Sequence, residues 1–408
     1  MRVIGEAAAV GPARPRLTLP ILIVIGALGA IGPVGTDMYL PALPTMASQL
    51  TTTAAWTQLT LTAFSVGLAL GQLLLGTLSD RLGRRRLLLG GMALLVISAM
   101  LCATAPTVQL LILWRIVMGI SGAAGIVIGR AIAADLTSGA AAARVFSLLG
   151  LIAGIGPILG PLFGGLVLGW AGWRAIFWAI LVFAILLLAG TLSLIPETLP
   201  QSARHTGGFR EFLRTATGIL TRRRFLGYAL AFWFGFGTMF AYISASPFVV
   251  QRILGFSPGQ FTLVFACNAV GIVIAGSLSA WLVGRVKAST LAAIGLTAQL
   301  VASLTLVTAA LTASTQPVII LPALFLITTG AGFIMGNCTA LAVAGIGARG
   351  TAMALLGCVQ FLVAGTVAPL VGLAGETSLV PLAVVTLSCV LIALCGLGYG
   401  RAHHSELD

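Results

Sequence analysis

A chain of 408 residues with 59% hydrophobic side chains and only 8% charged ones carries more apolar surface than a water-soluble fold can bury. Its formal charge of +13 comes from arginines scattered along the chain, whereas a nucleic-acid-binding domain would gather them on one face. The composition therefore indicates an integral membrane protein.

The predicted elements follow from the spacing of the charges. Charged residues divide the chain into uncharged runs, and a helix of about twenty residues is enough to cross a bilayer. Turn-forming residues divide the longer runs, for example "PALPTMASQLTTTAA" at 41–55 and "ASTQP" at 313–317. The sequence therefore predicts an all-α integral membrane fold of twelve transmembrane helices, at about 17–41, 55–79, 87–104, 108–135, 143–169, 174–195, 225–250, 257–284, 289–312, 316–343, 350–373 and 378–400.

The positive charges indicate an orientation, because Arg and Lys accumulate on the cytoplasmic side of short loops. If both termini lie in the cytoplasm, only Arg174 and Arg252 fall in outer loops, while Arg115 and Arg130 fall inside the fourth helix. The basic start of the chain continues into a full span without an evident cleavage site, so we expect it to be retained. We therefore predict cytoplasmic termini.

The longest polar stretch, 196–224, separates two predicted six-helix bundles. The bundles resemble each other, because "GTLSDRLGRRR" at 76–86 follows the second helix and "GSLSAWLVGRV" at 276–286 follows the eighth. Two repeated bundles around a central cavity are typical of secondary transporters. The predicted organisation is a cytoplasmic tail, a first bundle, a cytoplasmic linker, a second bundle and a second cytoplasmic tail, at 1–16, 17–195, 196–224, 225–400 and 401–408.

Cysteine and histidine do not form a recognisable chemical site in the sequence. The six cysteines lie in predicted apolar helices without paired spacing, and His205, His403 and His404 lie in the linker and the tail. We therefore expect no disulfide, no metal, no cofactor and no catalytic residues, and we predict that the protein is not an enzyme. A membrane sensor would need a soluble output domain, for which the linker and the tail leave no room.

Asp37 is the one acidic residue that the predicted helices contain away from their ends. The first helix is predicted to end near Pro41, which puts Asp37 about 6 Å from the outer face, and Arg115 lies roughly 10 Å below that face, so the depths are compatible with a contact. Burial and a nearby cation have opposite effects on the pKa of a carboxyl group, so small movements can switch its protonation. We interpret Asp37 and Arg115 as the proton-coupling site; the alternative is a carboxylate that fixes the turn before Pro41.

The segment between the second and third helices, "GTLSDRLGRRR", resembles a signature of the major facilitator superfamily. "LWRIVMGISGAAG", which contains Arg115, resembles the second signature of that family, with Met118 where Gln is common. The resemblance implies a conformational gate on the cytoplasmic side. The alternative is a basic loop that only fixes the topology. The implied gate residues are Gly76, Asp80, Arg81, Gly83, Arg84 and Asp135.

The fifth helix contains "GIGPILGPLFGGLVLG", which resembles the motif of drug:proton antiporters in this superfamily. Glycines one turn apart allow two helix backbones to slide at close contact. Glycine-rich packing without a role in transport is the alternative. The matching residues are Gly156, Gly160, Pro161, Gly164 and Gly165.

Further stretches resemble the bicyclomycin-resistance (Bcr/CflA) subfamily: "TDMYLPALP", "PETL", "YISASPFV" and "GTAMALLGCVQFLVAGTVAPLVGL". The resemblance spans nearly the whole chain. It implies export of small amphipathic antibiotics, such as bicyclomycin or chloramphenicol-like compounds, in exchange for protons.

An amphipathic drug needs an apolar, aromatic cavity with few polar groups. A phenylalanine stripe with i, i+4, i+8 spacing on the seventh helix fits this need, although such stripes also face lipid or a neighbouring helix. The candidate pocket residues are Tyr39, Phe232, Phe236, Phe240, Tyr242, Asn268, Asn337 and Gln360.

We therefore predict a multidrug or antibiotic efflux protein that works by proton-coupled antiport and alternating access in the bacterial inner membrane. The alternative is a proton-coupled symporter that imports a small metabolite. No Gly-x-x-x-x-Gly-Lys-Ser/Thr nucleotide-binding loop is present in the sequence, so ATP drive is not expected. The expected partners are a small drug, protons and lipid, without nucleic acid, and we expect the protein to function as a monomer.

Overall fold

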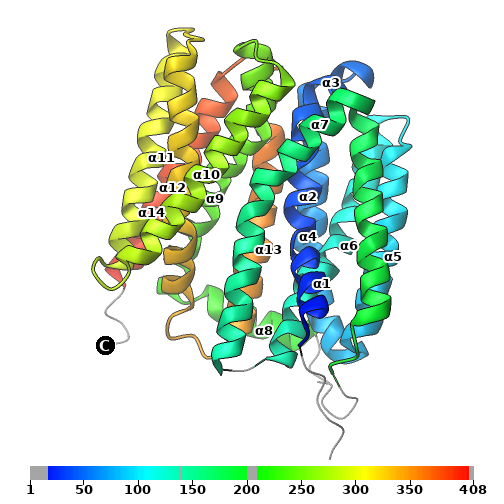
Figure 1. The fold of residues 1–408 in the computed structure, drawn as a ribbon. Helices are drawn as coiled ribbons and strands as arrows, with labels where there is room; N and C mark the ends of the chain where they lie inside the picture. Colours follow the sequence, from blue (N-terminus) through cyan, green and yellow to red (C-terminus); the bar gives the residue numbers. More distant parts are fainter. Residues whose placement is uncertain (1–16, 138, 200–208, 404–408) are drawn as a thin grey trace, which may run out of the picture.

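The computed structural model describes residues 17–137, 139–199 and 209–403 (Figure 1). These residues form helices and no β-strand apart from an isolated bridge between Val283 and Val286. The N-terminal tail expected at 1–16, together with His205 and His404, lies outside the described residues. The elements are α1 (Leu19–Gly29), α2 (Ile31–Asp37), η1 (Leu40–Ala42), α3 (Leu43–Gln49), α4 (Ala54–Leu82), α5 (Arg84–Ala103), α6 (Val108–Leu136), α7 (Gly139–Leu194), α8 (Phe209–Leu220), α9 (Arg223–Phe248), η3 (Val249–Ile253), α10 (Pro258–Leu282), α11 (Ala288–Leu311), α12 (Pro317–Val343), α13 (Arg349–Leu370) and α14 (Val380–Ala402).

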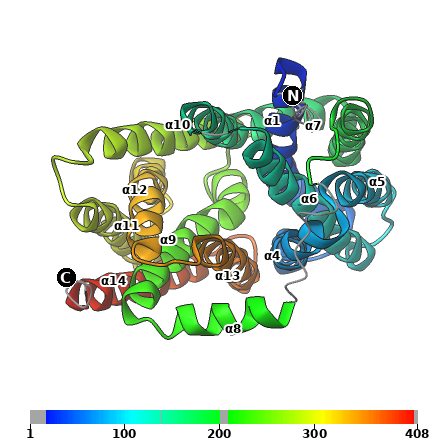
Figure 2. The same cartoon turned by 90° about the horizontal axis from the view of Figure 1, so that it is seen from below.

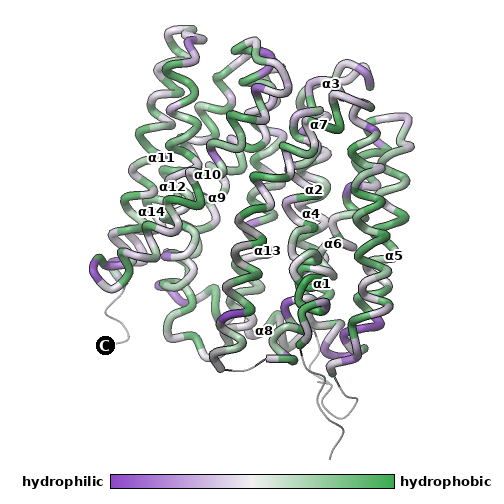
Figure 3. Tube along the Cα trace, in the orientation of Figure 1, coloured by the Kyte–Doolittle hydropathy of each residue, from purple (hydrophilic) through white to green (hydrophobic). Residues whose placement is uncertain are grey.

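Eleven helical segments of this described chain are long and apolar enough to cross a membrane. Figure 3 shows that hydrophobic residues run along the helices, whereas hydrophilic residues concentrate near their ends. One segment, Ile155–Leu194, has 40 residues, about twice the length that a bilayer requires. It is interrupted at Gly172, whose φ of 76° and ψ of 179° are not helical, and the two parts of α7 run in opposite directions (Figure 1). Glycine allows this reversal because it has no Cβ.

The first span is longer than the sequence predicts. We expected it to end near Pro41 and expected 41–55 to be a loop, but the helical path continues through η1 and α3 to Gln49. Pro41 and Pro44 stand in the first turns of η1 and α3, where a missing N–H group is tolerated. The predicted end is therefore wrong, and Asp37 lies up to about 18 Å from the end of this span at 1.5 Å per residue.

The linker contains a helix, α8, that the sequence analysis does not predict. Its apolar residues recur with helical spacing, and Ala216 and Ile219 are buried in one core with α9 and α12 residues such as Phe225 and Ile334. Figure 2 shows α8 lying across one end of the molecule. The linker therefore packs against the second bundle.

The helices form two bundles, α1–α7 and α9–α14 (Figure 2). They meet along two helix pairs, α4 with α13 and α7 with α10. In each bundle the first glycine of the repeated stretch faces the helix two further along the chain, because a Cβ at Gly76 would lie 3.6 Å from Val127 of α6 and a Cβ at Gly276 would lie 3.8 Å from the Gly332 backbone of α12. We name the two ends of the molecule the α3 end and the α8 end, after the helices found there (Figure 1).

Candidate functional site

Asp37, the last residue of α2, is only 4% exposed and lies against α7. A Cβ at Gly160 would lie 3.2 Å from the Asp37 Cβ, and a Cβ at Gly164 would overlap the backbone of Met38. One turn earlier, a Cβ at Gly156 would lie 2.5 Å from Cγ of Pro33. These three glycines therefore form the face of α7 on which α2 packs, as their spacing predicts.

The rest of the glycine motif faces the second bundle. A Cβ at Gly165 would lie 2.6 Å from Oγ1 of Thr262, which belongs to α10, and Pro161 is buried. The motif therefore brings α7 close to α2 on one side and to α10 on another.

Arg115 on α6 is completely buried among aromatic rings. Its Cζ lies 4.4 Å from the ring centroids of both Tyr39 and Phe64, and 5.9 Å from that of Phe177. Its Nε donates a hydrogen bond to the carbonyl oxygen of Thr60 at 3.3 Å, and the hydroxyl groups of Tyr39 and Thr60 lie 3.0 Å apart. Cation–π contacts therefore stabilise the guanidinium group in place of a carboxylate.

Two nitrogens of Arg115 remain weakly paired. Nη1 lies 3.6 Å from Sδ of Met118, the residue that departs from the family signature, and the buried Nη2 has no hydrogen-bond partner in the described chain. A buried unsatisfied donor is destabilising by about 1–3 kcal/mol. Charged groups kept inside a membrane at such a cost commonly belong to a functional site.

The contact between Asp37 and Arg115 that their depths allow is absent among the described residues. The ion pairs of the described residues are those of Arg84 with Asp80 and Asp135, and of Arg252 with Glu376. Tyr39 faces Arg115, and Asp37 precedes Tyr39 by two positions, which turns it by roughly 200° around a helical path. Compatible depth was therefore not enough, because Tyr39 rather than Asp37 faces Arg115.

The chain that follows Asp37 packs against the second bundle, because η1 contacts α10 and α9, the helix that carries Tyr242. The Tyr242 hydroxyl accepts a hydrogen bond of 2.8 Å from Nδ2 of Asn268 on α10, and its ring stacks on Phe265 with centroids 5.7 Å apart. Two of the predicted pocket residues, Tyr242 and Asn268, are thus brought together.

The other predicted pocket residues separate into different environments. The ring centroids of Phe236 and Phe240 lie 5.9 Å apart, in the core cluster shared by the two bundles. Phe232 instead belongs to the cluster formed by the second bundle and α8. Nδ2 of Asn337 already donates to Ser279 at 2.7 Å and to a backbone carbonyl of its own helix. Gln360 is half-buried on α13. Of the predicted phenylalanine stripe, only Phe236 and Phe240 therefore share one environment.

The predicted gate residues meet at the α8 end. Arg84 pairs with Asp80 at 2.6 Å and with Asp135 at 3.3 Å. Gly83 makes the sharp turn between α4 and α5 with a φ of 97°. Glu197, which follows α7, accepts a hydrogen bond of 2.9 Å from the backbone N–H of Arg84. The network joins the ends of α4, α5, α6 and α7, and all of these helices belong to the first bundle.

Two members of the predicted gate stay outside this network. Arg81 is exposed and forms none of the ion pairs described above. A Cβ at Gly76 would be in ordinary van der Waals contact with Val127 of α6, so this position does not require glycine for close packing. The network contains Glu197 and Thr198, whose hydroxyl donates to Asp135 at 2.7 Å. The "PETL" stretch of the subfamily resemblance was the only signal for these residues, and it gave no partner for them.

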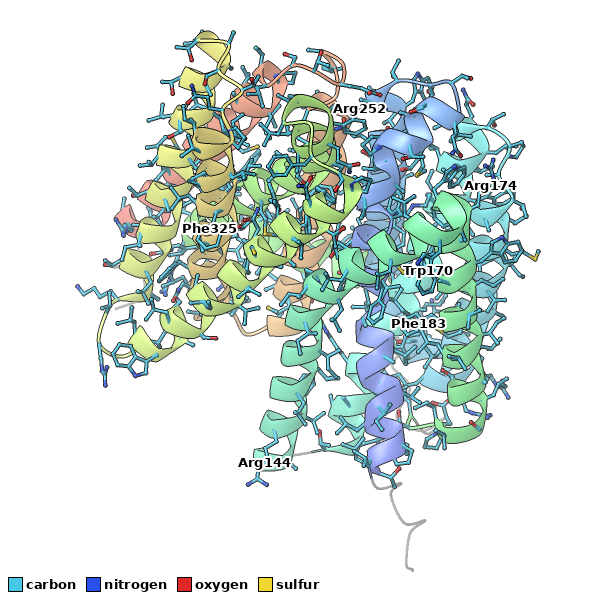
Figure 4. The ribbon with its side chains drawn as sticks, turned by 45° about the horizontal axis from the view of Figure 1, so that its top comes forward. Arg144, Trp170, Arg174, Phe183, Arg252 and Phe325 are labelled. Carbon is cyan, nitrogen blue, oxygen red and sulfur yellow. The ribbon has the colours of Figure 1, made fainter. Side chains whose placement is uncertain are left out.

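At the α3 end, hydrogen bonds link the two bundles. Arg252 donates to the carbonyl of Pro44 at 3.2 Å and to the hydroxyl of Ser48 at 3.0 Å, and Glu376 pairs with Arg252 at 3.1 Å. Figure 4 shows Arg252 where the bundles meet at this end, with Arg174 on the first bundle and Arg144 at the α8 end.

Three more hydrogen bonds join the bundles near the same end. The amide of Gln251 donates to the carbonyl of Pro41 at 3.1 Å, that of Gln58 donates to Ser244 at 3.1 Å, and the Thr62 hydroxyl donates to Gly365 at 2.8 Å. No further hydrogen bond between the bundles occurs in the part of the chain that the structure describes. Sequence reasoning missed these residues, because polar residues near helix ends are common and their partners lie far away in the chain.

Within the described residues, no group of three or more His, Cys, Asp or Glu side chains could hold a metal ion. The arrangement instead offers the buried carboxyl group of Asp37, the hydrogen-bonded pair of Tyr242 and Asn268, and a polar network at each end of the molecule.

The family model described as Major Facilitator Superfamily matches residues 25–369. The chain is 34% identical over 384 residues to an uncharacterized MFS-type transporter, YdgK, of Bacillus subtilis, an alignment that covers 93% of this chain and 95% of that protein. It is 30% identical over 384 residues to a bicyclomycin resistance protein homolog of Haemophilus influenzae, with 92% and 95% covered. It is 37% identical over 240 residues to a chloramphenicol resistance protein of Pseudomonas aeruginosa, with 59% and 56% covered.

Solved structures share the fold. A bacterial homolog of the human lysosomal transporter Spinster, in an inward-facing and unoccupied conformation, has a TM-score of 0.71 at 16% identity and covers 94% of this chain and 96% of its own. A D-xylose-proton symporter has a TM-score of 0.69 at 18% identity, with 92% and 96% covered.

Proposed function

The chain belongs to the major facilitator superfamily, and its relatives confirm the resemblance to drug-efflux members; from this premise we propose that it exports small amphipathic drugs by proton-coupled antiport. The proposal includes twelve crossings of the bacterial inner membrane, with the two parts of α7 counted separately at Gly172. Bicyclomycin- and chloramphenicol-like compounds are the proposed substrates, because relatives carry those names.

We assign the α8 end to the cytoplasm. Positive residues lie at this end on both bundles, including Arg85 and Arg144 on the first and Arg223 and Arg401 on the second, whereas Arg174 and Arg252 lie toward the α3 end. Cytoplasmic loops of membrane proteins are enriched in Arg and Lys. Both chain termini would then lie in the cytoplasm.

On this assignment the described state faces inward. The hydrogen bonds between the bundles lie toward the α3 end, and Figure 1 shows α7 and α10 diverging from there toward the α8 end. Drug would enter from the cytoplasm, and export would require the α3 end to open.

The observation that carries the coupling proposal is the position of Asp37. Its carboxyl group is buried, has no ion-pair partner in the described chain, and precedes η1, which packs against α9 and α10 of the second bundle. Such a group can bind or release a proton as bundle movement changes its access to water. A drug that fills the same space would favour the state in which the proton is released.

The driving force is sufficient for this exchange. One proton that moves down a potential of 100 mV supplies ~2.3 kcal/mol. That free energy supports roughly a fifty-fold concentration gradient of a neutral drug.

The test is chloramphenicol-induced proton release from purified protein in lightly buffered detergent, together with chloramphenicol accumulation in everted vesicles. We expect Asp37→Asn to fold, because the amide has the size of the neutral acid, and to lose both proton release and uphill accumulation. The matched control is Asp135→Asn, which removes a carboxylate at the α8 end and should keep proton release.

Two results would contradict the proposal. If Asp37→Asn released protons as the wild-type protein does, the coupling site would lie elsewhere, with Asp135 as the next candidate. If chloramphenicol moved in the same direction as the protons, the protein would be a symporter.

A further inference from the structure

A cavity of about 480 Å³ lies at the α8 end of the second bundle, away from the candidate drug site. The junction of α8 and α9 forms one wall, with Arg222, Arg223 and Arg224 in succession. The end of α12 with the loop after it, and His403 at the end of α14, form the rest. No acidic residue lines this cavity in the described chain.

The arginines are only partly paired by the protein. Nη1 of Arg222 lies 3.4 Å from the carbonyl oxygen of Gly345, and Nη1 of Arg223 lies 3.4 Å from Nε2 of His403. Nε of Arg224 is buried and has no hydrogen-bond partner in the described residues. None of these arginines belongs to an ion pair among the described residues. Three neighbouring positive charges repel one another unless an anion compensates them.

The backbone adds further donors to this site. α9 begins at Arg223, and no side chain caps its N-terminus, nor does its first turn contain an acidic residue. The first N–H groups of a helix have no partner within that helix, and their dipoles favour an anion. The site thus combines guanidinium groups, which match the geometry of phosphate oxygens, with free backbone donors.

We propose that this cavity binds a phosphate group. The chemistry fits two sources, the headgroup of an anionic phospholipid and a soluble phosphate compound. Basic pockets between transmembrane helices commonly take lipid headgroups, and this cavity lies where helices of the second bundle end. The inference does not depend on the drug or on proton coupling, because none of its residues belongs to the candidate transport site.

The experiment uses full-length protein in neutral detergent and measures thermal unfolding with inorganic phosphate, with dioctanoyl phosphatidylglycerol, or with dioctanoyl phosphatidylcholine. We expect phosphatidylglycerol or inorganic phosphate to raise the unfolding temperature, and phosphatidylcholine to have less effect. The Arg222→Gln/Arg224→Gln double variant should bind the stabilising compound at least about tenfold more weakly, since charge-assisted hydrogen bonds are lost. Arg86→Gln, which removes an exposed charge at the same end, should bind as the wild-type protein does.

The two sources give different results. Stabilisation by phosphatidylglycerol that inorganic phosphate does not compete away identifies a lipid site, whereas stabilisation by inorganic phosphate alone identifies a soluble ligand. Equal binding by the double variant and the wild-type protein would overturn the proposal, as would equal stabilisation by both lipids.

A second measurement needs no variant, in case the double variant does not fold. Phenylglyoxal modifies accessible arginines, and mass spectrometry locates the modified positions. The compound that stabilises the protein should slow modification at Arg222 and Arg223 at least about fivefold and leave Arg86 unchanged, because bound phosphate oxygens occupy the guanidinium donors. Equal modification rates with and without that compound would also overturn the proposal.

Discussion

The two ends of the molecule use polar side chains in different ways. At the α3 end, Arg252, Gln251 and Gln58 form hydrogen bonds from one bundle to the other. At the α8 end, Arg84 joins Asp80 and Asp135 within the first bundle alone. The first arrangement holds two bodies together, and the second makes one body rigid.

This difference suits the proposed alternating-access cycle. In such a cycle the bonds between the bundles would have to break, and a typical hydrogen bond contributes only about 0.5–1.5 kcal/mol net. The ~2.3 kcal/mol that one proton supplies over 100 mV is comparable with about two of the five bonds near the α3 end. Bonds within a bundle need not break, so the ion pairs of Arg84 can persist while the bundle moves.

The largest effect should come from Gly164→Leu. A side chain at this position would collide with the backbone of Met38 and separate α2 from α7. We expect transport to be lost and the unfolding temperature of the detergent-purified protein to fall. The matched control is Gly169→Leu, because Gly169 is exposed and has open space around it. Normal transport by Gly164→Leu would mean that the close approach of α2 and α7 is not required.

Arg252→Ala should have the next largest effect. It removes two hydrogen bonds to the first bundle and leaves Glu376 without its ion pair, so the α3 end should open about tenfold more often. Distances between spin labels on α3 and α9 would measure the open population. Arg174→Ala is the control, because Arg174 bonds the Ala105 carbonyl inside the first bundle. An unchanged open population in Arg252→Ala would mean that the bonds of Arg252 do not hold the α3 end closed.

Asp80→Asn should have a smaller effect at the α8 end. Arg84 would lose one partner but keep Asp135, and partly exposed ion pairs are worth about 0.2–1 kcal/mol. We expect a two- to fivefold slower transport cycle, roughly what that free energy allows, with normal amounts of protein in the membrane. Arg81→Gln should leave the rate unchanged, since Arg81 is exposed outside the network. A wild-type rate for Asp80→Asn would remove this network from the gating cycle.

The smallest expected effect is that of Arg115→Met on the pH midpoint of transport. Arg115 forms no ion pair with Asp37, so its removal should lower activity through lost packing and leave the pH midpoint of transport in place. Transport rates measured across a pH series give this midpoint. A shift of one pH unit or so would mean that the two residues meet in another state of the cycle.

The sequence by itself determined the class of fold and the close contact at the antiporter motif. Lipid offers no hydrogen bonds to the backbone, so each span must be an apolar helix, and that requirement is visible in the spacing of charges. The glycines at 156, 160 and 164 share one face of the helix, because residues four positions apart lie one turn apart in any α-helix. Local patterns failed where two structures suit the same residues, as in 41–49, which forms helical turns with proline in their first turns.

Only the tertiary structure decided which charged and polar residues meet. Along the path from α2 to η1, Asp37 lies against α7 and Tyr39 faces Arg115, and the packing of neighbouring helices sets these directions. The two residues that accept hydrogen bonds from Arg252, Pro44 and Ser48, belong to the other bundle, about two hundred positions away in the chain. Depth in the membrane follows from residue counts along one helix, but contact depends on how separate helices pack, and that information is spread over both bundles.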